Sequence, residues 1–338
     1  MDNLSPKASP ASDTPVSALT LIETARSEEP PPLSTPLNTP ARGAEDRKKA
    51  FGLALLCLLF WQVTLRIPIG HVAIVWTTTL LYLLLTLLFT VRTARALRSP
   101  AVQRMSLLLS VVLALPAVLV PILLFSYPQW GGWHALSPFL NGYFLLLRAV
   151  PGLKGLLLIW FAASLGVCLS RLVREFKLLL PMAVALALVD LYVVFGGGLV
   201  TQAHQGENRG AEIAMKTMLV NLPRPTAHPP SGAEPMQLAV GFADFMFLAL
   251  FFACFARFGI PSRTTFIVVS SVLAAYMVLV GVTGWAMPAL VPIAVVVIGM
   301  NLRRFRYERS EAFALLYAGV IMAVVAGCYF FVNRTPIK

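Results

Sequence analysis

The chain has 338 residues, of which 58% are hydrophobic and only 12% are charged. Soluble domains carry about 25% charged residues, so this composition excludes an ordinary soluble enzyme and predicts a polytopic membrane protein. The net charge of +12 comes from Lys and Arg clusters beside apolar segments. This distribution is typical of the positive-inside rule and argues against nucleic-acid binding.

The first 48 residues differ from the rest of the chain. They are rich in Pro, Ser and Thr and show no sustained apolar period. Such a composition cannot bury enough apolar surface to fold, so residues 1–48 are expected to form a disordered cytoplasmic tail.

Apolar segments of span length then follow one another and predict an all-α fold, a polytopic bundle of transmembrane helices. They lie at about 50–66, 72–91, 105–126, 153–172, 177–198, 236–256, 264–284, 286–302 and 312–332. A weaker segment, 134–150, either crosses the bilayer or lies in its interface, so nine or ten spans are expected. The segment 286–302 is short and proline-rich at its start, which predicts a broken or partly unwound helix.

Two aspartates, Asp190 and Asp244, are the only acidic residues inside these apolar spans. A carboxylate near the bilayer centre costs about 2.5–3.5 kcal/mol on insertion scales, so both need a compensating reason. They lie on consecutive spans that are expected to be antiparallel neighbours. Asp190 is six residues before Gly196 and Asp244 is nine after Pro235, so both carboxyls are expected at similar depth. Gly241, three residues before Asp244, is expected on the same helical face, where its small size allows close helix approach.

Two adjacent carboxyls in a low-dielectric site cannot both ionise easily, so one is expected to keep its proton. The anionic carboxyl then draws a proton from a water molecule that attacks a peptide carbonyl. The protonated one hydrogen-bonds the carbonyl oxygen. This chemistry needs no metal and no cofactor, and the pair titrates as a unit.

At these residues the chain resembles the presenilin and signal peptide peptidase family of intramembrane aspartic proteases. The resemblance covers about residues 177–302 and is carried, in order, by Val189–Asp190, Gly241–Phe242–Ala243–Asp244 and Pro288–Ala289–Leu290. It implies a presenilin-like bundle, catalytic Asp190 and Asp244, and substrate-binding residues Gly241, Pro288, Ala289 and Leu290. It also implies transmembrane proteins or peptides as substrates, cut within the bilayer.

The chain departs from the family pattern at two motif positions and beyond its end. Val189 replaces a usual tyrosine, and Ala243 replaces the second glycine. A further apolar segment follows the Pro-Ala-Leu motif. The expected organisation is therefore N-terminal helices at 49–176, a catalytic core at 177–302 and an extra helix at 303–338.

Pro288 and Pro292 stand four residues apart, so regular helical bonding is interrupted and backbone carbonyls are freed near the aspartates. At least one free carbonyl is expected to face the pair.

Two alternatives to the protease stay open, a catalytically inactive scaffold of the same family and a proton-coupled transporter. The expected location is the bacterial inner (plasma) membrane.

Overall fold

The computed structural model describes most of the chain from Pro40 onward. The described residues are 40–66, 72–126, 138–195, 209–223, 239–283 and 288–304, with the single residues 313, 317, 319, 320 and 324. The predicted disordered tail up to residue 39 and most of the predicted span 312–332 lie outside these ranges.

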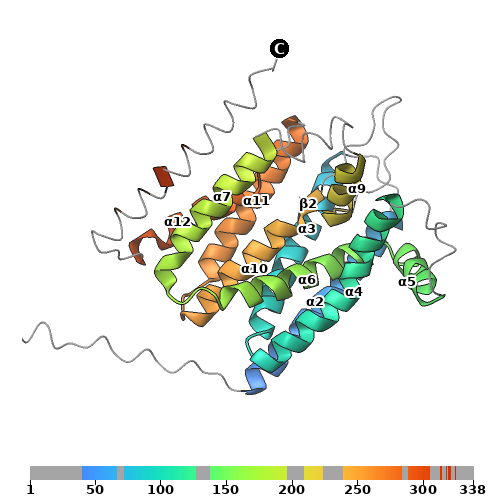
Figure 1. Cartoon of the computed structure of the whole chain (residues 1–338), viewed down its shortest axis with the longest axis horizontal. Helices are drawn as coiled ribbons and strands as arrows, with labels where there is room; N and C mark the ends of the chain where they lie inside the picture. Colours follow the sequence, from blue (N-terminus) through green and yellow to red (C-terminus); the bar gives the residue numbers. More distant parts are fainter. Residues whose placement is uncertain are drawn as a thin grey trace, which may run out of the picture. The chain divides into compact units, whose positions relative to one another are not determined.

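The described elements are nearly all helices (Figure 1). They are α2 (Pro40–Arg66), α3 (Val72–Ala96), α4 (Pro100–Ser126), α5 (Pro138–Ala149), α6 (Leu153–Ser170), η3 (Phe176–Leu178), α7 (Leu179–Phe195), α9 (Arg209–Met218), α10 (Phe242–Arg257), α11 (Arg263–Thr283), α12 (Leu290–Asn301) and η4 (Leu302–Arg304). Two short strands, β1 (Leu219–Asn221) and β2 (Ala239–Gly241), pair between α9 and α10. The prediction of a helical membrane protein is confirmed.

Six of the described helices are long and apolar enough to cross a membrane. They belong to α2, α3, α4, α6, the continuous η3–α7 segment and α11. Three predicted spans are shorter, because α5 and α12 have 12 residues each and α10 has 16. A 12-residue helix is only about 18 Å long, against about 30 Å for the hydrocarbon core. The total of nine or ten spans stays a prediction.

The first helix begins earlier than expected, at Pro40 inside the predicted tail. Two ion pairs stabilise this extension. Lys49 pairs with Glu45 one turn before it, and Asp46 lies 3.8 Å from Arg92 of α3. The second pair also fixes the start of α2 beside the end of α3, so these two helices are antiparallel.

The most deeply buried helix is α10, which carries Asp244. Its phenylalanines Phe245, Phe251, Phe252 and Phe255 are at most 1% exposed. The helix packs most extensively against α6 and next against α3. It therefore belongs to the hydrophobic core, and it fixes the carboxyl that it carries.

A glycine of α6 makes the close approach to α10 possible. A Cβ atom built on Gly166 would lie 2.2 Å from the backbone oxygen of Met246. No side chain fits there without a shift of backbone against backbone. The position of α10, and hence of Asp244, depends on this glycine.

The helix that carries Asp190 packs differently. The main partner of α7 is α12, which also packs against α11 and to a lesser extent against α10. The two aspartate helices α7 and α10 make little direct contact with each other, and α12 packs against both. The short α12 connects the two halves of the candidate site.

We predict that Gly166→Ala lowers the stability of the bundle by about 1–3 kcal/mol, because overpacking forces the backbone to shift. Thermal unfolding in detergent, followed by circular dichroism, measures this. The matched control is Gly299→Ala in α12, where an added Cβ meets nothing within 4 Å. Equal midpoints for the two variants would contradict the close contact of α6 and α10.

Candidate functional site

Asp190 lies in the last two turns of α7 and is partly buried. Its Oδ2 accepts a hydrogen bond of 2.8 Å from the backbone N–H of Leu290. Leu290 is the first residue of α12, so this N–H has no partner within its own helix. The Asp190 carboxyl therefore satisfies a free donor at the start of α12.

Asp244 lies in the first turn of α10. Its Oδ2 accepts a 3.1 Å hydrogen bond from the backbone N–H of Gly241, the residue that precedes the helix. The expected 236–256 helix therefore begins later, at Phe242, because residues 239–241 pair as strand β2. Asp244 sits at a helix N-terminus and not in the middle of a long span.

Gly241 consequently has a different role from the one expected. It is not on the helical face of Asp244, since it ends β2 in an extended conformation. A Cβ atom at Gly241 would lie 3.1 Å from Oδ2 of Asp244. The absence of a side chain thus leaves room for the carboxyl to fold back onto the Gly241 N–H, and no partner helix is involved.

The segment Pro288–Leu290 lies beside Asp190, where the sequence placed it. Its contact with the carboxyl is the Leu290 N–H and not the expected free carbonyl. The carbonyl of Pro288 instead accepts a 2.8 Å hydrogen bond from the Tyr276 hydroxyl of α11. Ala289 is the residue that precedes α12.

Within the described part of the predicted segment 286–302, which starts at residue 288, the predicted unwinding is limited, because α12 is helical from Leu290 through Pro292. Pro292 is the third residue of this helix. Its position in the first turn explains this, since the N–H groups there have no intrahelical acceptor and a proline removes no bond.

Both carboxyls thus lie at the N-termini of short helices, Asp244 at α10 and Asp190 at α12. Backbone N–H groups and the helix dipole make such ends attractive to negative charge. The two aspartates are close enough to interact electrostatically, and Tyr276 interacts with both. The structure therefore brings together Asp190, Asp244, Tyr276 and the start of α12 from four different helices.

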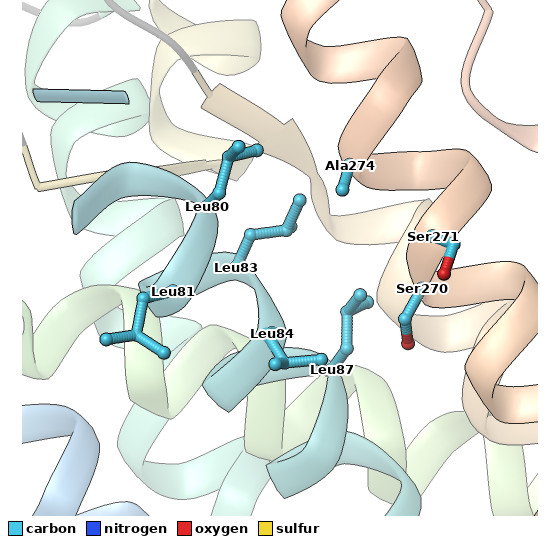
Figure 2. Close-up of a pocket in the computed structure, with 8 residues that line it drawn as sticks. All are labelled: Leu80, Leu81, Leu83, Leu84, Leu87, Ser270, Ser271 and Ala274. Atoms are coloured by element: carbon cyan, nitrogen blue, oxygen red, sulfur yellow. The ribbon is translucent and has the colours of Figure 1, made fainter. Parts of the chain in front are cut away.

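One hollow in the structure is separate from this site. Figure 2 shows leucines of α3 on one side of a cavity of about 320 Å³, with Ser270, Ser271 and Ala274 of α11 on the other. No acidic or basic side chain lines it. It is an apolar groove without the groups that hydrolysis needs, so the site is defined by the two carboxyls and not by this hollow.

Comparisons with known proteins add no assignment. No protein-family model matches the chain, and no curated protein and no solved structure is significantly similar to it. Within the described ranges, no three His, Cys, Asp or Glu side chains gather in a way that could hold a metal ion.

Sequence reasoning missed two parts of the site. Tyr276 lies in a mostly apolar span, and a tyrosine hydroxyl buried there usually has a polar partner, which was the available signal. The β1–β2 pair was hidden because each strand has only three residues. In it Leu219 is opposite Gly241, Val220 opposite Val240 and Asn221 opposite Ala239.

We predict that Tyr276→Phe loosens the start of α12, because the Pro288 carbonyl loses its donor. Hydrogen–deuterium exchange of a peptide containing Leu290 should accelerate about fivefold, as expected for the loss of a hydrogen bond worth about 1 kcal/mol. Tyr317→Phe is the control, since the Tyr317 side chain is 71% exposed. Unchanged exchange in the Tyr276 variant would mean that its hydroxyl does not hold this segment.

Proposed function

We propose that the protein is an intramembrane aspartic endopeptidase that hydrolyses peptide bonds within transmembrane segments. The observation that carries the proposal is the convergence of Asp190 and Asp244, the only acidic residues of the apolar spans, on one site at the starts of two helices. A single buried carboxyl has many structural uses. Two carboxyls that interact can supply the base and the acid that this type of hydrolysis requires.

In the proposed reaction one carboxyl is anionic and the other is protonated. The anionic carboxyl removes a proton from water as the water oxygen attacks the peptide carbonyl carbon. The protonated carboxyl gives its proton to the carbonyl oxygen, which produces a neutral gem-diol. Collapse of the gem-diol breaks the C–N bond, with a proton passing to the leaving nitrogen, and restores one proton on the pair. The roles are assigned to the pair and not to either residue.

The strand pair beside Asp244 supports the binding of an unwound substrate. A transmembrane helix hides its carbonyls in internal hydrogen bonds, so it must become extended before hydrolysis. β2 ends three residues before Asp244, and β1 is the only strand that pairs with it in the described part of the chain. An extended peptide that adds to an edge of this sheet would gain backbone hydrogen bonds close to the carboxyls.

The proposed substrates are transmembrane proteins or peptides, and the proposed location is the bacterial inner (plasma) membrane. Gly241 and the segment Pro288–Leu290 are proposed to contact substrate, since they border the two carboxyls. The reaction as written uses no metal and no cofactor. An inactive scaffold and a proton-coupled transporter are the alternatives that the following experiment separates from the protease.

We predict that Asp190→Asn and Asp244→Asn each abolish cleavage of a model transmembrane substrate by the purified protein in liposomes. An amide oxygen still accepts the N–H bonds from Leu290 and Gly241, so the fold is retained, but an amide cannot share a proton. Gel analysis and mass spectrometry of the products measure cleavage.

Ala243→Gly is the matched control for Asp244→Asn. It changes the neighbouring residue, which is exposed, and leaves both carboxyls in place. Its activity should equal or exceed that of the wild type. Wild-type cleavage by both Asn variants would show that the aspartates are structural. A wild-type protein that cuts no substrate but moves protons in an Asp-dependent way would favour the transporter.

We also predict that substrate spans with Gly, Ser or Pro near the cut are cleaved faster than poly-Leu spans, because helix weakening makes unwinding easier. Proline weakens a helix by about 2 kcal/mol more than glycine does, so proline near the cut should increase the rate more than glycine. Matched substrates of equal length, differing only at one position, allow the rates to be compared directly. Equal rates for weakened and poly-Leu spans would show that unwinding does not limit the reaction.

A further inference from the structure

A backbone carbonyl at the start of α12 cannot be satisfied by its own helix. Ala289, the residue before α12, already has helical backbone angles, φ −80° and ψ −22°. Residues 289–291 therefore follow a helical path, on which an N–H at position 292 would donate to the carbonyl of Pro288. Residue 292 is a proline and has no N–H. Pro292 thus removes no bond of α12 itself, but it prevents the one further bond that would satisfy Pro288.

Tyr276 of α11 supplies the missing donor from another helix. Its hydroxyl donates a 2.8 Å hydrogen bond to the Pro288 carbonyl. Within the described ranges, no backbone N–H donates to that carbonyl. The tyrosine hydroxyl therefore takes the place of the helical hydrogen bond that Pro292 excludes, and it connects the start of α12 to α11.

The same piece of backbone contacts Asp190. The N–H of Leu290 donates a 2.8 Å hydrogen bond to Oδ2 of Asp190. Only Ala289 separates Leu290 from Pro288, so a hydroxyl of α11 and a carboxyl of α7 hold one short segment from two sides. Movement of Pro288 is therefore expected to move the Leu290 N–H relative to the Asp190 carboxyl.

We infer that Tyr276 is a positioning residue of the proposed peptidase, which holds the start of α12 so that Leu290 donates to Asp190. The inference rests on the proposed function. It gives Tyr276 no contact with the scissile bond, since the hydroxyl proton is used by the Pro288 carbonyl. A displaced Leu290 N–H leaves the Asp190 carboxyl less well oriented, and poor orientation of a reacting group lowers turnover.

The kinetic test compares variants of the full chain in liposomes at saturating concentrations of a model transmembrane substrate. Tyr276→Phe should lower kcat about fivefold, the effect of one lost hydrogen bond. Tyr82→Phe is the matched control and should keep the wild-type kcat. It removes the hydroxyl of another tyrosine, 1% exposed, which lies in α3 with its ring 5.2 Å from that of Trp61.

A second comparison tests the route through Pro288. Pro292→Ala restores an N–H that can donate to the Pro288 carbonyl, so the tyrosine hydroxyl becomes dispensable. Tyr276→Phe made in the Pro292→Ala background should therefore have almost no effect on kcat. The Tyr276→Phe and Tyr82→Phe pair decides the matter alone if Pro292→Ala fails to fold.

A spectroscopic test separates positioning from a general weakening of the bundle. Infrared spectra of protein with isotope-labelled aspartate carboxyls, minus the spectrum of Asp190→Asn, isolate the band of the Asp190 carboxyl. This band should shift in Tyr276→Phe, because the hydrogen bond from Leu290 weakens. It should stay at the wild-type position in Tyr82→Phe. The measurement needs no turnover.

The outcomes distinguish this inference from the proposed function. A wild type that cleaves no substrate would overturn the proposed function and the catalytic part of the inference, while the infrared band still decides whether Tyr276 holds Asp190. With an active wild type, an unchanged kcat or an unchanged Asp190 band in Tyr276→Phe would overturn the inference alone. An equally large loss of kcat in the Pro292→Ala background would overturn the route through the Pro288 carbonyl.

Discussion

The structure around the aspartates depends on one constraint, the need to satisfy backbone N–H groups where a helix begins inside apolar surroundings. Both α10 and α12 begin against the core, since Phe245 and Leu290 in their first turns are buried, so their first N–H groups need partners within the protein. Gly241 and Leu290 donate two of these groups to Asp244 and Asp190. The carboxyls therefore accept hydrogen bonds from N–H groups that have no partner within their helices. Those N–H groups in turn stabilise carboxyls inside an apolar bundle.

This mutual dependence explains why the two halves of the site differ in their support. Asp244 is fixed by the most buried helix, which packs closely on Gly166 of α6. Asp190 lies on α7, whose Val189, Leu191 and Val193 are all exposed and whose main partner is the short α12. One carboxyl is thus anchored in the core and the other at its margin. A substrate that approaches from the α7 side would meet the less tightly packed half first.

Hydropathy was sufficient to predict the helical membrane fold, because spans of 18 residues or more average out local irregularities. It could not predict where α10 begins. The segment 236–256 is apolar apart from Gln237 and Asp244, but residues 239–241 pair with a strand about twenty positions earlier, and such pairing leaves no periodic signal. The contact of Leu290 with Asp190 could be predicted in outline from the sequence, because paired prolines mark an interrupted helix. The Tyr276 contact depends on how α11 is turned relative to α12, which one sequence does not determine.

The two motif positions at which this chain differs from the pattern of the proposed protease family are both exposed. Val189 is 55% exposed, and Ala243 is exposed in the first turn of α10. Neither apolar side chain can hydrogen-bond a carboxyl; Asp190 accepts its hydrogen bond from Leu290, and Asp244 accepts its hydrogen bond from Gly241. The glycine that the carboxyl geometry does require, Gly241, is present. The departures therefore alter the surface beside the aspartates and leave their backbone donors unchanged, so their effect is expected on the fit of a substrate more than on the arrangement of the pair.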